Sequence, residues 1–299
     1  MTITGEIWAL AASMSLAVGP LFAVAPARAF GIVAFSALRM LAGSVILLVI
    51  ALVSVDTLGG NLFAWILIAG SSVVGIYISD ILTFYAQRTI GARATSALYA
   101  LQVPLTIFLA HAVLNETPTV TQAFGITLCF FGLCITILGR GSGVSWSTIS
   151  VQPDLLRIGV LAGLAVSVCQ AIAMVLIKSA LQTGADPIAA SAFRVTLAAV
   201  LVNPPAYGLG KAFTNLPHPF RPILFGTLAS ALAVNGGGMI FLMLAIAHSN
   251  LLASVSSLSS LAPVTTVPIL WALTGHAPTR LAALGVIVAV AGIMLIVGS

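Results

Sequence analysis

Charged residues are scarce in this chain: only 6% of its 299 residues are Asp, Glu, Lys or Arg, whereas 60% are hydrophobic. Soluble domains carry about 25% charged residues. A soluble fold of this size could not bury so much apolar surface, so that class of protein is excluded. Apolar stretches of about 20 residues predict membrane-spanning helices instead.

Residues suited to catalysis are also few, and their spacing argues against an enzyme. Of the six acidic residues only Asp80 lies well inside a predicted helix, so a pair of catalytic carboxylates is not expected. The sequence contains neither the HExxH motif of metalloproteases nor the GxxxxGK[ST] motif of ATP-driven pumps. The three cysteines lack CxxC spacing and are interpreted as packing residues. We expect a protein that is not an enzyme and uses no metal or cofactor.

The basic residues give a formal net charge of +5, yet they are scattered singly between apolar segments. This pattern fits membrane topology better than a phosphate-binding face, so nucleic acid is not an expected partner. The expected partners are the lipid bilayer and a small-molecule substrate, and the chain is expected to be a monomer.

Ten hydrophobic segments predict an all-α membrane protein with ten transmembrane helices. Five precede and five follow the longest polar connection, whose Gly, Ser and Pro content is typical of a loop. We therefore divide the chain into a first five-helix repeat (1–139), a connecting loop (140–154) and a second five-helix repeat (155–299). The predicted spans are 5–24, 30–53, 62–86, 91–113, 119–139, 155–181, 186–209, 221–246, 249–273 and 279–298.

The second half of the sequence resembles the first. The segment FSALRMLAG resembles SAFRVTLAA, which pairs Arg39 with Arg194 at an offset of 155. LQVPLT resembles LAPVTT, which pairs Pro104 with Pro263 at an offset of 159. Because each repeat has an odd number of helices, the second copy enters the membrane from the opposite side. Inverted repeats of this kind are typical of secondary transporters, whose central site lies between the two repeats.

The positions of Lys and Arg predict the orientation in the membrane. One set of alternate connections holds eight of them, whereas the other set, together with both termini, holds Lys178 alone. Positively charged loops stay in the cytoplasm. Both termini are therefore predicted on the non-cytoplasmic side of a bacterial inner membrane. The eight residues are Arg28, Arg88, Arg93, Arg140, Arg157, Lys211, Arg221 and Arg280.

The fourth and ninth predicted helices, LQVPLTIFLAHAVLNETPT and LAPVTTVPILWALTGHAPT, resemble those of the EamA-type transporters of the drug/metabolite transporter superfamily. The resemblance covers nearly the whole chain. In that family the apolar run of these two helices typically ends in Gly-Glu. Here the run of the fourth helix ends in Asn115 and Glu116, whereas that of the ninth ends in Gly275 and His276 and lacks the acidic residue. Within the superfamily the chain looks most like the YddG-type exporters of aromatic amino acids.

The resemblance implies a basket of eight helices around a central cavity, with the last helix of each repeat packed outside. The residues agree with the last point, because segment 119–139 has no charge and segment 279–298 has only Arg280. Both segments can face lipid, and their glycines suit close contact between helices. These glycines pair at an offset of 160: Gly125 with Gly285 and Gly132 with Gly292.

Three charged residues lie at membrane depth, where each is costly unless it is paired or faces water: Arg39, Asp80 and Arg194. Helix rise counted from the cytoplasmic ends places Arg39 and Asp80 at similar depth on adjacent helices. They either form a structural ion pair, or Asp80 serves in the cavity as a proton or cation site. Arg194 lacks an acid, because the offset of 159 leads from Asp80 to Met239. Backbone carbonyls, a lipid phosphate or a substrate carboxylate are the alternatives for its partner.

Polar side chains near mid-membrane form the predicted substrate site, although packing is the alternative role for each. Pro104, Pro263 and Gly237 are predicted to bend their helices, which would free carbonyl groups for a ligand. For Gly237, close packing of helices is the competing interpretation. The predicted substrate-binding or cavity residues are Tyr77, Asp80, Tyr99, Gln102, Gln170, Asn235, Ser256 and Ser260.

Together these features predict a secondary transporter that exports small organic metabolites, foremost amino acids with aromatic or apolar side chains, by alternating access. The alternative is an exporter of drugs or other amphipathic metabolites. Nucleotide sugars are not expected, because their phosphates would need several basic residues at the site. Coupling to protons would require a titratable cavity group, and Asp80 is the candidate.

Overall fold

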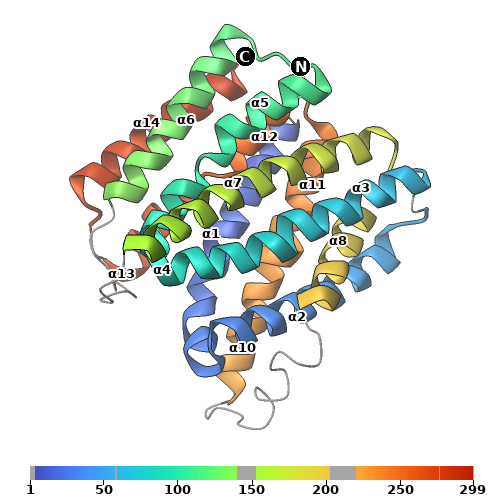
Figure 1. Ribbon diagram of the computed structural model, residues 1–299, viewed down its shortest axis with the longest axis horizontal. Helices are drawn as coiled ribbons and strands as arrows, with labels where there is room; N and C mark the ends of the chain where they lie inside the picture. Colours follow the sequence, from blue (N-terminus) through green and yellow to red (C-terminus); the bar gives the residue numbers. More distant parts are fainter. Residues whose placement is uncertain (1–3, 58, 140–152, 203–219, 276, 299) are drawn as a thin grey trace.

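The computed structural model describes residues 4–57, 59–139, 153–202, 220–275 and 277–298. These residues form helices and no strand, as predicted (Figure 1). Nine of the described helical segments are long and apolar enough to cross a bilayer, and the shorter apolar helix Pro187–Val202 brings the number of passes to ten. The all-α, ten-helix fold class is thereby confirmed. Most of the connecting loop at 140–154 lies outside the described residues.

The two halves of the chain have the same order of elements, except that α4 of the first half corresponds to two helices, α11 and α12, of the second. The first half contains α1 (Thr4–Phe30), α2 (Ile32–Ser54), α3 (Leu62–Ser72), η1 (Val73–Ile78), α4 (Ser79–Tyr99), α5 (Gln102–Leu114) and α6 (Val120–Gly139). The second contains α7 (Pro153–Gln182), α8 (Pro187–Val202), α10 (Phe220–Ala231), η2 (Leu232–Gly238), α11 (Met239–His248), α12 (Leu252–Ser259), α13 (Ala262–Thr274) and α14 (Arg280–Val297).

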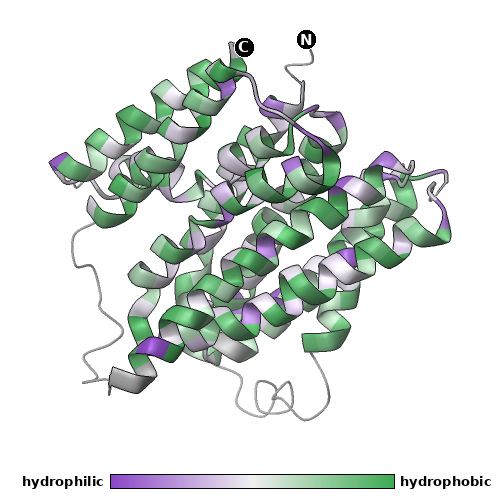
Figure 2. Ribbon diagram, turned by 45° about the horizontal axis from the view of Figure 1, so that its top comes forward, coloured by the Kyte–Doolittle hydropathy of each residue, from purple (hydrophilic) through white to green (hydrophobic). Residues whose placement is uncertain are grey.

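Hydrophobic residues make up most of each helix (Figure 2), and many of the large apolar side chains are exposed, as a lipid environment requires. Leu52, Val120 and Ile287 are 83%, 88% and 66% exposed. The buried residues include many alanines and serines beside the aliphatic side chains, so that helices approach closely. A bilayer, unlike water, accepts this exposed apolar surface at no cost.

The chain stays helical where we predicted an interruption between the third and fourth spans. Residues 87–90 continue α4, because none of them breaks a helix, and the turn is made at Gly91 alone, with φ 82° and ψ 158°. Gly31 makes the turn between α1 and α2 in nearly the same way, with φ 81° and ψ 154°. Only glycine adopts this region readily, so each connection needs a single residue.

The fourth and ninth spans break near their prolines, as the repeat predicts. The breaks lie at residues 100–101 and 260–261, which are one offset of 160 apart. At each break the backbone changes to tighter bonds: Leu101 donates to Leu98 and Leu261 donates to Leu258. Each break precedes its proline by two or more residues, because a proline is tolerated in the first turn of a new helix.

Each repeat also contains one π-helical stretch, which the sequence analysis missed. The two stretches, η1 and η2, begin 159 residues apart and interrupt the third and eighth spans. Gly237 lies in η2, where a Cβ atom would come within 2.9 Å of the Ser15 hydroxyl oxygen of α1. Gly237 thus lies close to α1 and within an irregular helical stretch, which fits close packing as well as a bend.

The last helices of the two repeats, α6 and α14, lie side by side at one edge of the molecule (Figure 1). Their glycines bring the two backbones into contact: a Cβ atom at Gly125 would lie 2.9 Å from the Gly292 carbonyl oxygen, and one at Gly132 would lie 2.5 Å from the Ala289 nitrogen. The predicted close contact of these helices is confirmed. In space Gly125 lies against Gly292, whereas the repeat pairs Gly125 with Gly285. The contacts differ from the sequence pairing because the two helices run antiparallel.

Candidate functional site

The intramembrane charges and the helix breaks come together at the interface between the repeats. Asp80, in the first turn of α4, interacts electrostatically with Arg39 of α2 and Arg194 of α8. Tyr99, at the end of α4, interacts electrostatically with Arg194 and Asp80. These residues belong to both repeats and lie next to the two π-helical stretches. They define the candidate site.

Arg194 is held by the protein itself. Its side chain is only 3% exposed, one terminal nitrogen contacts the Met239 sulfur at 3.1 Å, and the other donates to the Ser71 carbonyl at 3.5 Å. A Cβ atom at Gly75 would lie 2.8 Å from this guanidinium. Of the partners considered for Arg194, the backbone carbonyl is therefore the one present in this structure, together with Met239.

Arg39 and Asp80 do not form the direct ion pair that was one of our two interpretations. Among the described residues, no ion pair of 4.0 Å or shorter joins either side chain to a partner. Both side chains are half-buried. Arg39 lies over the ring of Phe35, 5.8 Å from its centroid, and Asp80 accepts no hydrogen bond from any described group.

The two repeats exchange hydrogen bonds beside these charges. The Asn235 amide of η2 donates to the Arg39 carbonyl at 3.0 Å, and the Ser72 hydroxyl donates to the Arg194 carbonyl at 2.7 Å. The backbone next to each buried arginine is thus fixed by the other repeat. Asn235, predicted as a cavity residue, is 4% exposed and has this structural role in the conformation described.

The broken fourth and ninth spans meet through one pair of side chains. Gln102, the first residue of α5, donates to the Ser260 hydroxyl at 2.7 Å, and Ser260 in turn donates to the Ser256 carbonyl at 2.6 Å. Ser256 itself is 1% exposed, and its hydroxyl has no partner. The structure therefore brings together Gln102 and Ser260, two of the predicted cavity residues, and connects Ser256 to them through its backbone carbonyl.

The remaining predicted residues lie on the third and sixth spans. Gln170 of α7 donates to the Gly75 carbonyl at 2.7 Å and to the Ser79 hydroxyl at 3.0 Å. It therefore binds a carbonyl of η1 and fixes the start of α4, immediately before Asp80. Tyr77 is half-buried within η1, where the wider helical turn changes the three-residue spacing on which its predicted alignment with Asp80 depended.

Comparison with known proteins identifies the architecture. The sequence profile of the EamA-like transporter family matches residues 3–138 and again residues 157–298. The chain belongs to the EamA-like transporter family. The resemblance found in the sequence is thus confirmed at the level of the family, and the protein is a membrane transporter whose partners are a small-molecule substrate and the lipid bilayer.

A solved structure titled "Crystal structure of protein" matches the chain with a TM-score of 0.76. It is 15% identical in sequence, and the match covers 99% of this chain and 96% of the other. This likeness shows that the EamA-like fold extends over the full chain. No curated protein matches the sequence.

A second polar cluster in this EamA-like chain was missed by sequence reasoning. It lies at the corner between α11 and α12, on the side of the termini. The Lys178 ammonium donates to the Ile246 carbonyl at 3.1 Å and to the Ser249 carbonyl, and the Glu116 carboxylate accepts from the Leu252 amide at 2.6 Å. A cation thus satisfies the end of one helix and an anion caps the start of the next.

Glu116 lies between α5 and α6, outside the membrane-spanning segments. Burial raises the pKa of its carboxyl, an effect that the Leu252 amide and the nearby Lys178 oppose. One carboxylate oxygen, Oε1, is buried without a partner. The Asn-Glu end of the fourth span could have indicated this cap, whereas a single lysine in an apolar segment gave no signal of its partners.

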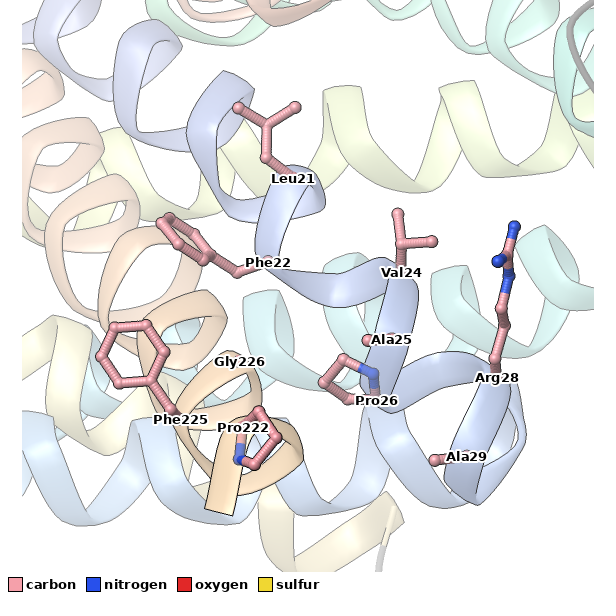
Figure 3. Close-up of a pocket in the computed structure, with 10 residues that line it drawn as sticks. All are labelled: Leu21, Phe22, Val24, Ala25, Pro26, Arg28, Ala29, Pro222, Phe225 and Gly226. Carbon is pink, nitrogen blue, oxygen red and sulfur yellow. The ribbon is translucent and has the colours of Figure 1, made fainter. Parts of the chain in front are cut away.

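An open pocket lies away from the candidate site, between α1 and α10 (Figure 3). Its wall is apolar apart from Arg28, and Phe22 and Phe225 stack edge to face beside it. None of the predicted site residues contributes to this pocket. Within the described chain, no cluster of His, Cys, Asp and Glu residues could hold a metal ion.

Proposed function

We propose that this EamA-like transporter exports small organic metabolites, foremost amino acids with aromatic or apolar side chains. The observation that carries the proposal is the position of Asp80, an acidic residue without a hydrogen bond at membrane depth, beside Arg39 and near Tyr99. Charged residues inside a membrane face a cavity or pathway when they are not paired. Tyr77 and Tyr99 are half-buried and would supply the aromatic wall of a central cavity.

Alternating access would move one five-helix repeat (1–139) against the other (155–299). The breaks at residues 100–101 and 260–261, together with η1 and η2, support this mechanism because irregular helices are the parts of a transporter that surround its site. The hydrogen bond between Gln102 and Ser260 joins the two repeats. Such a movement would either break this hydrogen bond or keep it while both residues move.

The proposed location is a bacterial inner membrane, in which the protein acts as a monomer with both termini on the non-cytoplasmic side. The distribution of Lys and Arg supports this orientation, and both termini lie at the same end of the molecule (Figure 1). A single cysteine at residue 2 or residue 299, in a chain without its native cysteines, should react with an impermeant reagent added to intact cells. Labelling only after permeabilisation would reverse the orientation.

Uptake of labelled phenylalanine and tryptophan into proteoliposomes tests the proposed substrate. We expect saturable uptake that aromatic and large apolar amino acids inhibit, while charged amino acids do not. The same experiment with an imposed pH gradient measures coupling to protons. If folded protein takes up neither amino acid, the aromatic amino-acid proposal fails, and transport of drugs or other amphipathic metabolites becomes the better explanation.

A further inference from the structure

The unsatisfied charge of Asp80 is the feature that the proposed function leaves unexplained. Its carboxylate accepts no hydrogen bond from the described residues, and its Oδ2 atom is completely buried. A buried polar group without a hydrogen bond costs about 1–3 kcal/mol, and an ionised one costs more. Native proteins retain such groups where a ligand, ion or reaction uses them.

Arg39 is unsatisfied in the same way. Its Nε atom is buried without a partner, and its guanidinium donates no hydrogen bond to any described group. The contact with the Phe35 ring, 5.8 Å from the centroid, leaves the donors of the guanidinium edge unused. The side chain is half-buried, so part of it can be reached from outside the packed core.

The second repeat provides an internal comparison. There Arg194 and Met239 stand where the first repeat has Arg39 and Asp80. Arg194 touches the uncharged Met239 at 3.1 Å, whereas Arg39 and its opposite charge remain more than 4.0 Å apart. Attraction between opposite charges is strong at membrane depth, so the separation in the first repeat must be maintained by the surrounding structure.

Contacts from the second repeat hold the backbone beside each of these two charges. The Arg39 carbonyl is bound by Asn235, and the Gln170 amide holds both Gly75 and Ser79 just before Asp80. The arginine and the aspartate are therefore anchored on separate helices by different partners. A cation and an anion that lie near each other without a partner suit a molecule that carries both charges.

We propose that Asp80 and Arg39 bind the two ends of a zwitterionic amino-acid head group: the Asp80 carboxylate accepts hydrogen bonds from the ammonium group, and the Arg39 guanidinium donates to the carboxylate. This inference rests on the proposed transport of amino acids and specifies how they are recognised. The Asp80–Arg39 pair and the ligand each have zero net charge, so each charge of the ligand meets an opposite charge. Arg194 takes no part, because its side chain is only 3% exposed and its two terminal nitrogens contact Met239 and the Ser71 carbonyl.

Three probes with the same aromatic ring test the head-group site: phenylalanine, 3-phenylpropionate without the ammonium group, and phenethylamine without the carboxylate. Their binding to the purified full-length protein is measured by competition with labelled phenylalanine. We expect phenylalanine to bind at least tenfold more tightly than either analogue, because each analogue leaves one site charge unpaired. This comparison uses the unmodified protein and does not depend on the folding of a variant.

Two variants assign each end of the ligand. Asp80→Asn should weaken the binding of phenylalanine at least tenfold, so that phenylalanine no longer binds more tightly than 3-phenylpropionate. Arg39→Gln should remove the tighter binding of phenylalanine relative to phenethylamine. The matched controls are Asp56→Asn and Arg88→Gln, which change exposed residues outside the site and should retain the selectivity. Size-exclusion chromatography verifies that each variant is folded.

The outcomes separate the two proposals. If either analogue binds the unmodified protein as tightly as phenylalanine does, the head-group site is refuted while transport of aromatic compounds stands. If Asp80→Asn keeps its preference for phenylalanine and loses only the response to a pH gradient, Asp80 is a proton site, and the head-group role is equally refuted. If folded protein binds none of the three probes, both proposals fail.

Discussion

Replacing Gly132 by alanine tests the contact between α6 and α14, which joins the ends of the two repeats. The added Cβ atom would lie 2.5 Å from the backbone nitrogen of Ala289 and 2.8 Å from its Cα atom, whereas ordinary contacts begin at 3.4 Å. The backbones must therefore move apart by about 0.9 Å, the difference between 3.4 and 2.5 Å. No change of rotamer can relieve this contact, because the neighbouring atoms are backbone.

The movement would also affect the next contact along the helices. A Cβ atom at Gly285 would lie 2.5 Å from the Thr136 nitrogen and 2.8 Å from the Gly132 carbonyl oxygen, so both glycines belong to one tightly packed segment. Overpacking of this kind costs about 1–3 kcal/mol. At about 2–4 °C per kcal/mol, we expect the thermal midpoint in detergent to fall by several degrees.

The control is Gly70→Ala in α3, where the nearest atom to the added methyl group would be the Leu176 Cδ1 atom at 3.6 Å. Both variants gain the same helix propensity from alanine, so their difference isolates the packing. The folded fraction is measured by size-exclusion chromatography after heating at graded temperatures. The reasoning is refuted if Gly132→Ala is as stable as Gly70→Ala.

Two further predictions concern the contacts between the repeats. Glu116→Ala should lower stability by about 1 kcal/mol through loss of the helix cap, whereas Glu116→Gln should keep the hydrogen bond to the Leu252 amide. Because burial raises the pKa of Glu116 in the folded protein, ionisation of this carboxyl destabilises the fold. Stability should therefore fall as the pH rises from the ordinary pKa range of a carboxyl through the raised pKa of Glu116. In Glu116→Gln, the thermal midpoint should no longer show this fall with pH. Gln102→Leu and Ser260→Ala should each reduce stability by about 1 kcal/mol. The double variant should lose clearly less stability than the sum of the two single losses, because both changes remove the same hydrogen bond. Additive losses in this double-mutant cycle would contradict a direct contact.

Much of the fold follows from the sequence because membrane helices carry strong signals. Hydrophobic length gives the ten passes, and the offset of 159–160 residues predicts that Pro104 and Pro263 mark equivalent breaks. The glycines of α6 and α14 indicate close packing without any knowledge of the partner helix. These features depend on local composition, which the bilayer makes decisive.

The irregular and long-range features could not be predicted in the same way. The π-helical stretches η1 and η2 have the same apolar composition as ordinary helix, so no periodicity distinguishes them. The role of Lys178 depends on carbonyls that become free only where α11 ends, 68 residues further along the chain. The tight turn at Gly91 was not predicted, because the neighbouring polar stretch at residues 87–90 indicated a loop at its own position.

The two repeats differ at membrane depth where the first has Asp80 and the second has Met239. Both repeats keep an arginine at membrane depth and bind its backbone carbonyl from the opposite repeat. In the second repeat Met239 replaces the acid, and Arg194 turns to that sulfur and to the Ser71 carbonyl, where it holds α8 against α3. In the first repeat Asp80 and Arg39 interact electrostatically, but Asp80 Oδ2 and Arg39 Nε are both buried without a hydrogen-bond partner. If both arginines served only to join helices, the acid would have no advantage over methionine, since an unpaired carboxylate costs more than a thioether at this depth. The asymmetry therefore agrees with the head-group site that we propose for Asp80 and Arg39, in which only the first repeat carries both charges.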